Sequence, residues 1–225
     1  ESFERERLFS SNAAHELRTP LAELKSISQM GATWEDAATP ERFREVSEVA
    51  DEMRDILDKL ALLARADAGQ IPVNREPVRP ADTVETLLER FASRIEEQKL
   101  EVKNRTGGGY LETDTVLFSA ICRNLIDNAV TYAPGGTTVE IEVRGDRLAV
   151  TNEAPELANS DLDYLFDSFW RHDESRTGGG HSGLGLPIVR ACADLLDARC
   201  RAELTDRGLL TIAVEGLEGN DSDDV

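Results

Sequence analysis

Apolar residues recur between positions 43 and 64 at intervals that alternate between three and four. They are Phe43, Val46, Ala50, Met53, Leu57, Leu60 and Ala64. This spacing places all seven on one seam of an α-helix, as in a coiled coil, and a second apolar stripe (Val49, Ile56, Leu63) runs beside the seam. A single neighbouring helix cannot cover both stripes. We therefore expect a helical hairpin that pairs with a second copy of the chain into a four-helix bundle.

The first helix of this hairpin is expected over about residues 3–30, where apolar residues again share one face. Residues 31–40 indicate a turn, and Thr39-Pro40-Glu41 is a good start for the second helix because proline fits the first helical turn. The alternative to dimerisation is a hairpin that packs against its own second domain.

The sequence pattern changes after residue 69. Gly69 and the proline-rich residues 71–80 indicate a linker. We expect a first domain over 1–69, a linker over 70–80, a second domain over 81–217 and a disordered acidic tail over 218–225. In the second domain, helices are expected near 81–97, 114–132 and 184–196, and strands near 100–104, 138–144, 147–152, 200–205 and 209–214. This order predicts an α+β sandwich with the helices on one face of the sheet.

Charge and composition restrict the function. The 225 residues include 44 acidic and 25 basic side chains, a net charge of −19, which argues against nucleic-acid binding because that requires basic patches. Cys122, Cys192 and Cys200 lie far apart and are interpreted as reduced core thiols of a cytosolic protein, not metal ligands. No apolar run reaches the roughly 18 residues that cross a bilayer. Since the chain begins in a helical pattern without Met, we expect it to be part of a longer protein.

The pattern with the most chemical content is Ala-Ala-His-Glu-Leu-Arg-Thr-Pro-Leu at residues 13–21. Inside a helix, Pro20 removes the N–H that would bond the Glu16 carbonyl, so it bends the helix at this turn. His15 and Thr19, four residues apart, share a face, and Glu16 can accept one ring N–H of the imidazole. The other ring nitrogen is then unprotonated and nucleophilic. A lone helical histidine is more often an ordinary surface or core residue, and these neighbours argue against that interpretation.

The helix expected over 114–132 contains Asn124 and Asn128 on one face. Their amide oxygens suit a Mg²⁺ ion that keeps most of its waters beside phosphates, although local hydrogen bonds would explain the pair equally well. Further on, residues 178–186 are rich in glycine and lead into a helix, a pattern typical of a mobile phosphate-binding lid. Residues 165–171 precede this loop with aromatic side chains and an arginine.

Four motifs in this order resemble those of one family. Residues 9–21 are similar to the H-box of the two-component sensor histidine kinases, and residues 124–129 (Asn-Leu-Ile-Asp-Asn-Ala) to their N-box. Residues 165–171 are similar to the F-box and residues 183–186 (Gly-Leu-Gly-Leu) to the G2-box. The resemblance covers nearly the whole chain. It implies an α plus α/β-sandwich architecture: a dimeric four-helix bundle for histidine phosphotransfer, followed by a Bergerat-type α+β ATP-binding domain.

The resemblance also implies roles for individual residues. His15 would be the phospho-acceptor, Glu16 the general base, and Thr19 the residue that orients a water when the partner is dephosphorylated. The implied nucleotide-binding residues are Asn124, Asn128, Tyr132, Asn152, Arg171, Gly183, Leu184 and Gly185. Among these, Asn128 would hold Mg²⁺, Tyr132 would pack near the adenine of ATP, and Arg171 would reach the γ-phosphate.

The implied activity is that of a kinase that autophosphorylates on histidine and passes the phosphoryl group to an aspartate of a response-regulator receiver domain. The enzyme would also dephosphorylate that regulator. It would work as a homodimer, as the cytoplasmic portion of a protein anchored in the inner or plasma membrane through a region that precedes this chain.

One motif departs from the family pattern. Residues 152–156 read Asn-Glu-Ala-Pro-Glu where the family's G1-box has Asp-x-Gly-x-Gly. Asn152 can still accept a hydrogen bond from the adenine amino group. The methyl group of Ala154 stands where glycine lets the backbone approach the base, and crowding would weaken ATP binding roughly ten- to a hundredfold. Thr131 also stands where many relatives have a lysine. A kinase-weak dimeric scaffold, or a sensor that acts mainly as a phosphatase, is therefore the alternative to an active kinase.

Overall fold

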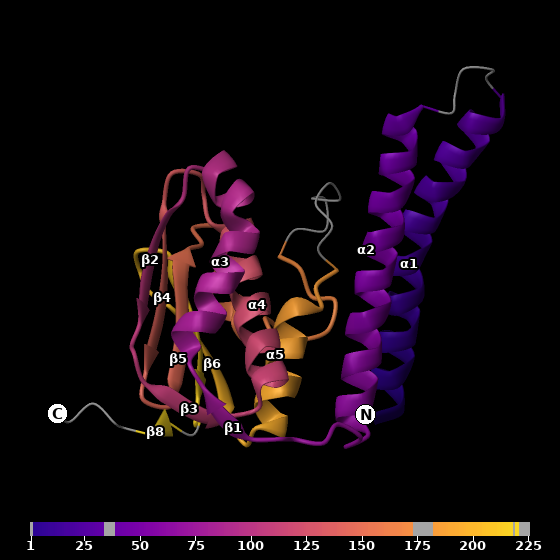
Figure 1. The fold of residues 1–225 in the computed structure, drawn as a ribbon. Coiled ribbons are helices and arrows are strands. Elements are labelled where there is room, and N and C mark those ends of the chain that lie inside the picture. Colours follow the sequence, from indigo (N-terminus) through magenta and orange to yellow (C-terminus); the bar gives the residue numbers. More distant parts are fainter. Residues whose placement is uncertain (1, 34–38, 173–181, 218, 221–225) are drawn as a thin grey trace.

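The computed structural model describes residues 2–33, 39–172, 182–217 and 219–220. Two long helices, α1 (Ser2–Thr33) and α2 (Pro40–Asp67), lie side by side as a hairpin (Figure 1). Thr39 caps α2, since its hydroxyl accepts a hydrogen bond from the Arg42 N–H at 3.4 Å. Helix α1 continues through Pro20 and ends three residues later than expected, because Gly31 is tolerated within a helix at a cost of only about 1 kcal/mol. Residues 34–38 of the expected turn lie outside the described residues.

The two apolar stripes of α2 have different surroundings. Val49, Ile56 and Leu63 are buried, and the last two belong to the same apolar cluster as the core of the second domain. On the heptad seam, the side chains of Phe43 and Leu57 are 66% and 51% exposed. The hairpin thus packs on its own second domain, as the alternative expectation had it, and still leaves part of the seam exposed.

The second domain is a five-stranded sheet with three helices on one face (Figure 1). The strand order is β2-β4-β5-β7-β6; β2 and β4 are parallel, and the other neighbours are antiparallel. The strands are β2 (Glu101–Thr106), β4 (Thr138–Arg144), β5 (Arg147–Glu153), β6 (Arg199–Leu204) and β7 (Leu209–Glu215). The helices are α3 (Pro80–Glu97), α4 (Thr115–Tyr132) and α5 (Gly185–Leu195), and a short 3₁₀ turn, η1, spans Asn159–Asp161. Each expected helix and strand is present within a few residues of its predicted range.

The core lies between this sheet and its helices. Helix α4 is apolar on most of its circumference, and Phe118, Ile121 and Ile126 are fully buried. The three cysteines are free. Burial raises the pKa of Cys192 and of Cys200 to about 12, so both stay protonated as ordinary core thiols.

Three short strands were not expected from the sequence. Strand β1 (Glu76–Val78) lies in the expected linker and pairs with β3 (Tyr110–Thr113), which also pairs with β8 (Gly219–Asn220) in the expected tail. The linker of 70–80 and the tail of 218–225 are therefore too long as predicted. Strands of two to four residues are too short to show an alternating pattern, and Pro77 in β1 is compatible only with an edge strand.

The chain joins the second domain before β1. The Asn74 N–H donates to Asp114 Oδ2 at 2.8 Å, and Arg75 Nη2 donates to the Leu196 carbonyl at 2.8 Å. These contacts tie residues 74 and 75 to the ends of α4 and α5. None of the described helices is apolar over enough of its length to cross a membrane.

Candidate active site

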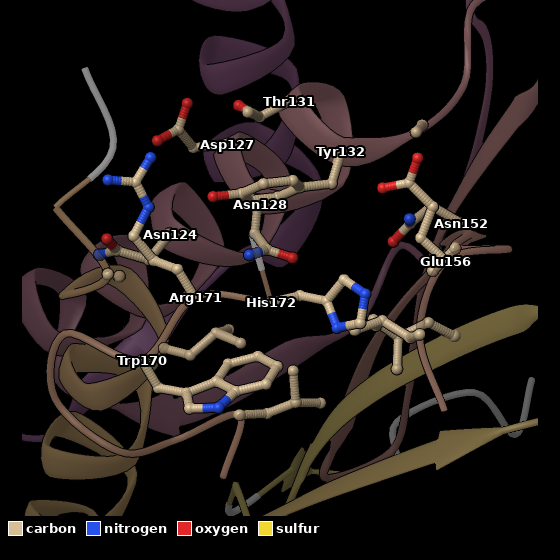
Figure 2. A pocket seen from close by; sticks show the side chains of 18 of the residues that line it. Asn124, Asp127, Asn128, Thr131, Tyr132, Asn152, Glu156, Trp170, Arg171 and His172 are labelled. Atoms are coloured by element: carbon tan, nitrogen blue, oxygen red, sulfur yellow. The ribbon is translucent and has the colours of Figure 1, made fainter. Parts of the chain in front are cut away.

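Helix α4 forms one wall of the site. Asp114 caps it, since Oδ1 accepts hydrogen bonds from the N–H groups of Val116 and Leu117 at 2.9 and 3.0 Å. Asn124 and Asn128 lie one turn apart on the face of α4 that lines a pocket (Figure 2). Tyr132 follows one turn later, 43% exposed at the rim.

The pocket has a volume of about 310 Å³. Seven of the eight predicted nucleotide-binding residues line it: Asn124, Asn128, Tyr132, Asn152, Arg171, Gly183 and Gly185. Leu184 is not among the residues that line the pocket. Its side chain is fully buried in the core, because the turn into α5 directs it away from the pocket. His15, Glu16 and Thr19 lie on α1 and do not line the pocket.

The two asparagines of α4 are not equivalent. Asn124 is buried and its Nδ2 donates to the Ala120 carbonyl at 2.8 Å, so the local hydrogen bond considered from the sequence accounts for its amide donor. Its Oδ1 packs beside Gly185, where a Cβ would come within 3.3 Å of it. Asn128 is half-buried and faces the pocket interior (Figure 2). Of these two amides, Asn128 is therefore better placed to bind a ligand.

The described residues contain no group of three His, Cys, Asp or Glu side chains that could enclose a metal ion. Mg²⁺ fits this donor set only as a hydrated ion that takes its other ligands from phosphates. Asn128 would supply the protein oxygen.

Asn152 lies beside Glu156, at the end of the pocket away from Asp127 and Arg171 (Figure 2). Its side chain is 3% exposed, and Nδ2 donates to the Glu153 carbonyl at 2.8 Å. This bond engages the amide donor, so the carbonyl oxygen Oδ1 is the group that can accept from a ligand amine. Ala154 also lines the pocket, and its N–H donates to the Gly208 carbonyl at 2.7 Å.

The loop before α5 passes very close to the segment 165–172. Gly183 has φ +65°, and a Cβ there would lie 2.8 Å from the Phe169 carbonyl carbon. Phe169 itself has φ +69°, and its N–H donates to the Gly183 carbonyl at 2.9 Å. Gly183 is therefore required by contact between two backbones. Residues 173–181, which include the first part of the expected lid (178–181), lie outside the described residues.

Ser182 is an orphaned polar group in this wall. Its side chain is 4% exposed, it lines the pocket, and among the described residues its Oγ has no hydrogen-bond partner. A buried hydroxyl without a partner is costly unless a ligand completes it. An anion bound beside Gly183 would accept a hydrogen bond from the Ser182 hydroxyl, so this wall of the pocket fits a nucleotide phosphate.

The segment 165–172 also contacts the hairpin. The rings of Phe169 and Phe9 on α1 have centroids 5.6 Å apart. Arg171 lines the pocket, with its guanidinium on the side of Asp127 (Figure 2), and its charge also acts on Glu16 of α1. His172 is exposed and also lines the pocket, with Nδ1 3.2 Å from Asp161 Oδ2.

His15 and Thr19 are exposed on α1, whereas Glu16 is half-buried and Pro20 is buried. The pKa of the Glu16 carboxyl is raised, chiefly because burial disfavours its charged form. The charges of Arg171 and His15 oppose this rise, and Glu52 adds to it. Glu16 is therefore a carboxylate with increased proton affinity next to an accessible imidazole.

Sequence reasoning missed two basic contributions to the site. Lys59 of α2 pairs with Asp55 and lines the pocket, so the hairpin supplies part of the wall. Arg94 of α3 pairs with Asp127, another residue of the wall. Neither belongs to a motif, and only the distance between elements in the folded chain reveals them.

Comparison with known proteins agrees with this architecture. Residues 5–69 match the family described as the His Kinase A (phospho-acceptor) domain. Residues 113–215 match the histidine kinase-, DNA gyrase B-, and HSP90-like ATPase family. Among solved structures, the Acinetobacter baumannii histidine kinase AdeS superposes with a TM-score of 0.76 at 22% identity, covering 92% of this chain and 98% of that one.

Curated relatives include the sensor protein kinase PmrB of Pseudomonas aeruginosa, 32% identical over 86% of this chain and 42% of PmrB. The sensor protein CutS of Streptomyces coelicolor is 30% identical over 95% of this chain and 53% of CutS. The chain thus spans about half the length of these relatives. With a phospho-acceptor hairpin, an ATPase domain and a pocket that approaches the histidine-bearing helix, the chain belongs to the sensor histidine kinases.

Proposed function

We propose that the protein transfers the γ-phosphoryl group of ATP to His15 and then to an aspartate of a response-regulator receiver domain. The observation that supports this most directly is the position of Arg171. It lines the nucleotide pocket, and its charge acts on Glu16, the neighbour of His15. A cation placed between the nucleotide pocket and His15 could neutralise the charge of the phosphoryl group as it passes from ATP to the histidine.

In the proposed orientation, the adenine lies at the Asn152 end and the phosphates at the end with Arg171. Asn152 Oδ1 accepts a hydrogen bond from the adenine amino group, and Tyr132 covers the base at the rim. Ser182 and the backbone at Gly183 receive the phosphates. Asn128 would hold a Mg²⁺ ion, which would supply positive charge beside the phosphates.

The proposed chemistry at the acceptor is an in-line attack by the unprotonated ring nitrogen of His15 on the γ-phosphorus. The bond to the β,γ-bridging oxygen breaks, and ADP leaves with that electron pair. Glu16 accepts the hydrogen bond from the other ring N–H and stabilises the positive charge that develops on the imidazole. Its raised pKa suits it to take up that proton.

Radiolabelled γ-phosphate ATP with Mg²⁺ tests the proposal. The chain should acquire an acid-labile, base-stable label that His15→Gln abolishes. A purified receiver domain should then take the label from the native chain. A native chain that binds ATP but acquires no label would favour the alternative of a kinase-weak scaffold.

We also propose that the hairpin forms a homodimer. The exposed Phe43 and Leu57 on α2 and Leu21 (57% exposed) on α1 would be buried between two copies. Leu57→Asp should produce monomers in multi-angle light scattering, whereas Asp58→Asn, which alters an exposed neighbour, should leave the mass unchanged. A Leu57→Asp dimer of native stability would contradict this arrangement.

The exposed face of α1 is the proposed docking site for the regulator, since His15 and Thr19 are accessible there. Thr19 would orient a water for dephosphorylation, so the protein would also act as a phosphatase. The names of the relatives describe sensor proteins, and we propose that the whole protein is anchored in a membrane through a region preceding this chain.

A further inference from the structure

Arg94 reaches the pocket wall from α3, a helix outside the motifs. Its Nη1 donates to Asp127 Oδ1 at 2.7 Å, and its Nη2 donates to Thr131 Oγ1. Both acceptors lie on α4, four residues apart, and both line the pocket. The guanidinium also lies over the Phe91 ring, 5.6 Å from its centroid, so contacts on two sides fix its orientation.

The ion pair between Arg94 and Asp127 matters for an anionic ligand because Asp127 is negatively charged. Its carboxylate faces the same end of the pocket as Arg171 and is only partly exposed (25%) (Figure 2). Phosphates bound at this end would lie within several ångströms of that negative charge. At such a distance, an uncompensated carboxylate would weaken phosphate binding by a factor on the order of a hundred.

The Asp127 carboxylate pairs with Arg94 from the neighbouring helix α3. Thr131, one turn after Asp127, is neutral, and its hydroxyl accepts a hydrogen bond from Arg94. Arg171 also lies near Asp127, but it is the residue expected to turn toward the γ-phosphate. When it does so, Arg94 is the cation that stays with the carboxylate.

We propose that Arg94 is a positioning residue for the phosphates of the nucleotide. It neutralises Asp127 and holds the Thr131 hydroxyl, so that the phosphate end of the pocket keeps an excess of positive charge when Arg171 moves. This inference rests on the proposed binding of ATP in this pocket, and it assigns to α3 a part of the site that the motifs do not contain.

The test compares nucleotides that differ in phosphate number. Isothermal titration calorimetry with Mg²⁺ should show that Arg94→Gln weakens ATP binding about ten- to a hundredfold, ADP binding less, and adenosine binding not at all. Arg90→Gln, one turn earlier on the same helix and exposed, is the matched control and should bind all three ligands as the native chain does.

A second variant separates charge compensation from packing. If Arg94 only holds α3 against α4, removal of the Asp127 charge should restore none of the lost ATP affinity. If it neutralises Asp127, the double variant Arg94→Gln/Asp127→Asn should recover most of the lost ATP affinity. Asp127→Asn alone should bind ATP at least as tightly as the native chain, and this measurement remains informative even if Arg94→Gln does not fold.

These measurements distinguish a failure of the proposed function from a failure of the role proposed for Arg94. A native chain that binds no ATP overturns the proposed function. If the native chain binds ATP, three results would overturn only the role proposed for Arg94. These are an Arg94→Gln variant that binds ATP as tightly as the native chain, an equal loss of adenosine affinity and ATP affinity in that variant, or no recovery of ATP affinity when Asp127→Asn is added.

Discussion

Replacement of Gly183 by alanine tests the close contact between the loop before α5 and segment 165–172. The new Cβ would lie 2.8 Å from the Phe169 carbonyl carbon, 2.9 Å from its Cα and 3.0 Å from the Trp170 carbonyl oxygen. These are backbone atoms, so no flexible side chain can move aside. Gly183 also has φ +65°, a conformation that costs an alanine about 1–2 kcal/mol.

The steric part adds to this conformational cost. Overpacking against backbone costs about 1–3 kcal/mol, so the total for Gly183→Ala is about 2–5 kcal/mol. In a chain of this length, each kcal/mol lowers Tm by roughly 2–4 °C, which gives an expected fall of about 4–20 °C. Since Arg171 follows Phe169 by two residues, its displacement should weaken ATP binding as well.

Gly69→Ala is the matched control, because Gly69 has φ +62° but no atom within 4 Å of a built Cβ. It carries the conformational cost without the clash. Thermal unfolding of both variants, followed by circular dichroism, isolates the steric contribution as their difference. If Gly183→Ala costs no more than Gly69→Ala, the loop does not depend on this backbone contact and the reasoning is wrong.

Three further predictions concern the cap of α4, the pH dependence of stability and the adenine end of the pocket. Asp114→Ala should lower stability by about 2–3 kcal/mol in urea unfolding, because it removes two cap bonds and the bond to Asn74; Thr39→Ala, with one bond at 3.4 Å, should cost less. The raised pKa of Glu16 means that its stabilising contribution is present below the unfolded-state pKa and is lost as pH rises through the folded-state value. Calorimetry should therefore find that Glu16→Gln raises Tm at pH 7 and changes it little at pH 4, and an equal effect at both pH values would contradict this. Ala154→Gly should tighten ATP binding roughly tenfold in titration calorimetry if the methyl group crowds the base, and unchanged affinity would show that it does not.

The repeats and motifs were sufficient to predict both domains. The heptad seam requires a long helix and a partner, and the alternation of the sheet strands predicts their inward faces, so these elements needed only local information. Most of the predicted pocket residues meet in one cavity because α4, the start of α5 and the end of β5 come together in the fold. Leu184 does not line the pocket and is fully buried, because residues next to glycines in a motif point in different directions, and the motif alone does not tell which of them enter the core.

The predictions failed where structure depends on distant partners. Strand β1 has three residues and exists only because β3 lies beside it. Residues 74 and 75 belong to the second domain and not to a free linker, because they form hydrogen bonds with Asp114 and Leu196. Likewise, Lys59 and Arg94 belong to no motif. Lys59 lines the pocket and Arg94 contacts its wall only because their helices pack beside it.

The sequence by itself determined the helices and strands, the histidine proposed as phospho-acceptor with its neighbouring acid, and the set of side chains suited to a nucleotide, because periodicity and short spacing act within one element. Only the tertiary structure decided which side chains face each other across elements. It buried one stripe of α2 and left the other partly exposed. It also placed Arg171 where its charge acts on Glu16 and Arg94 against Asp127, because charges far apart in the chain interact only after packing has brought them within a few ångströms.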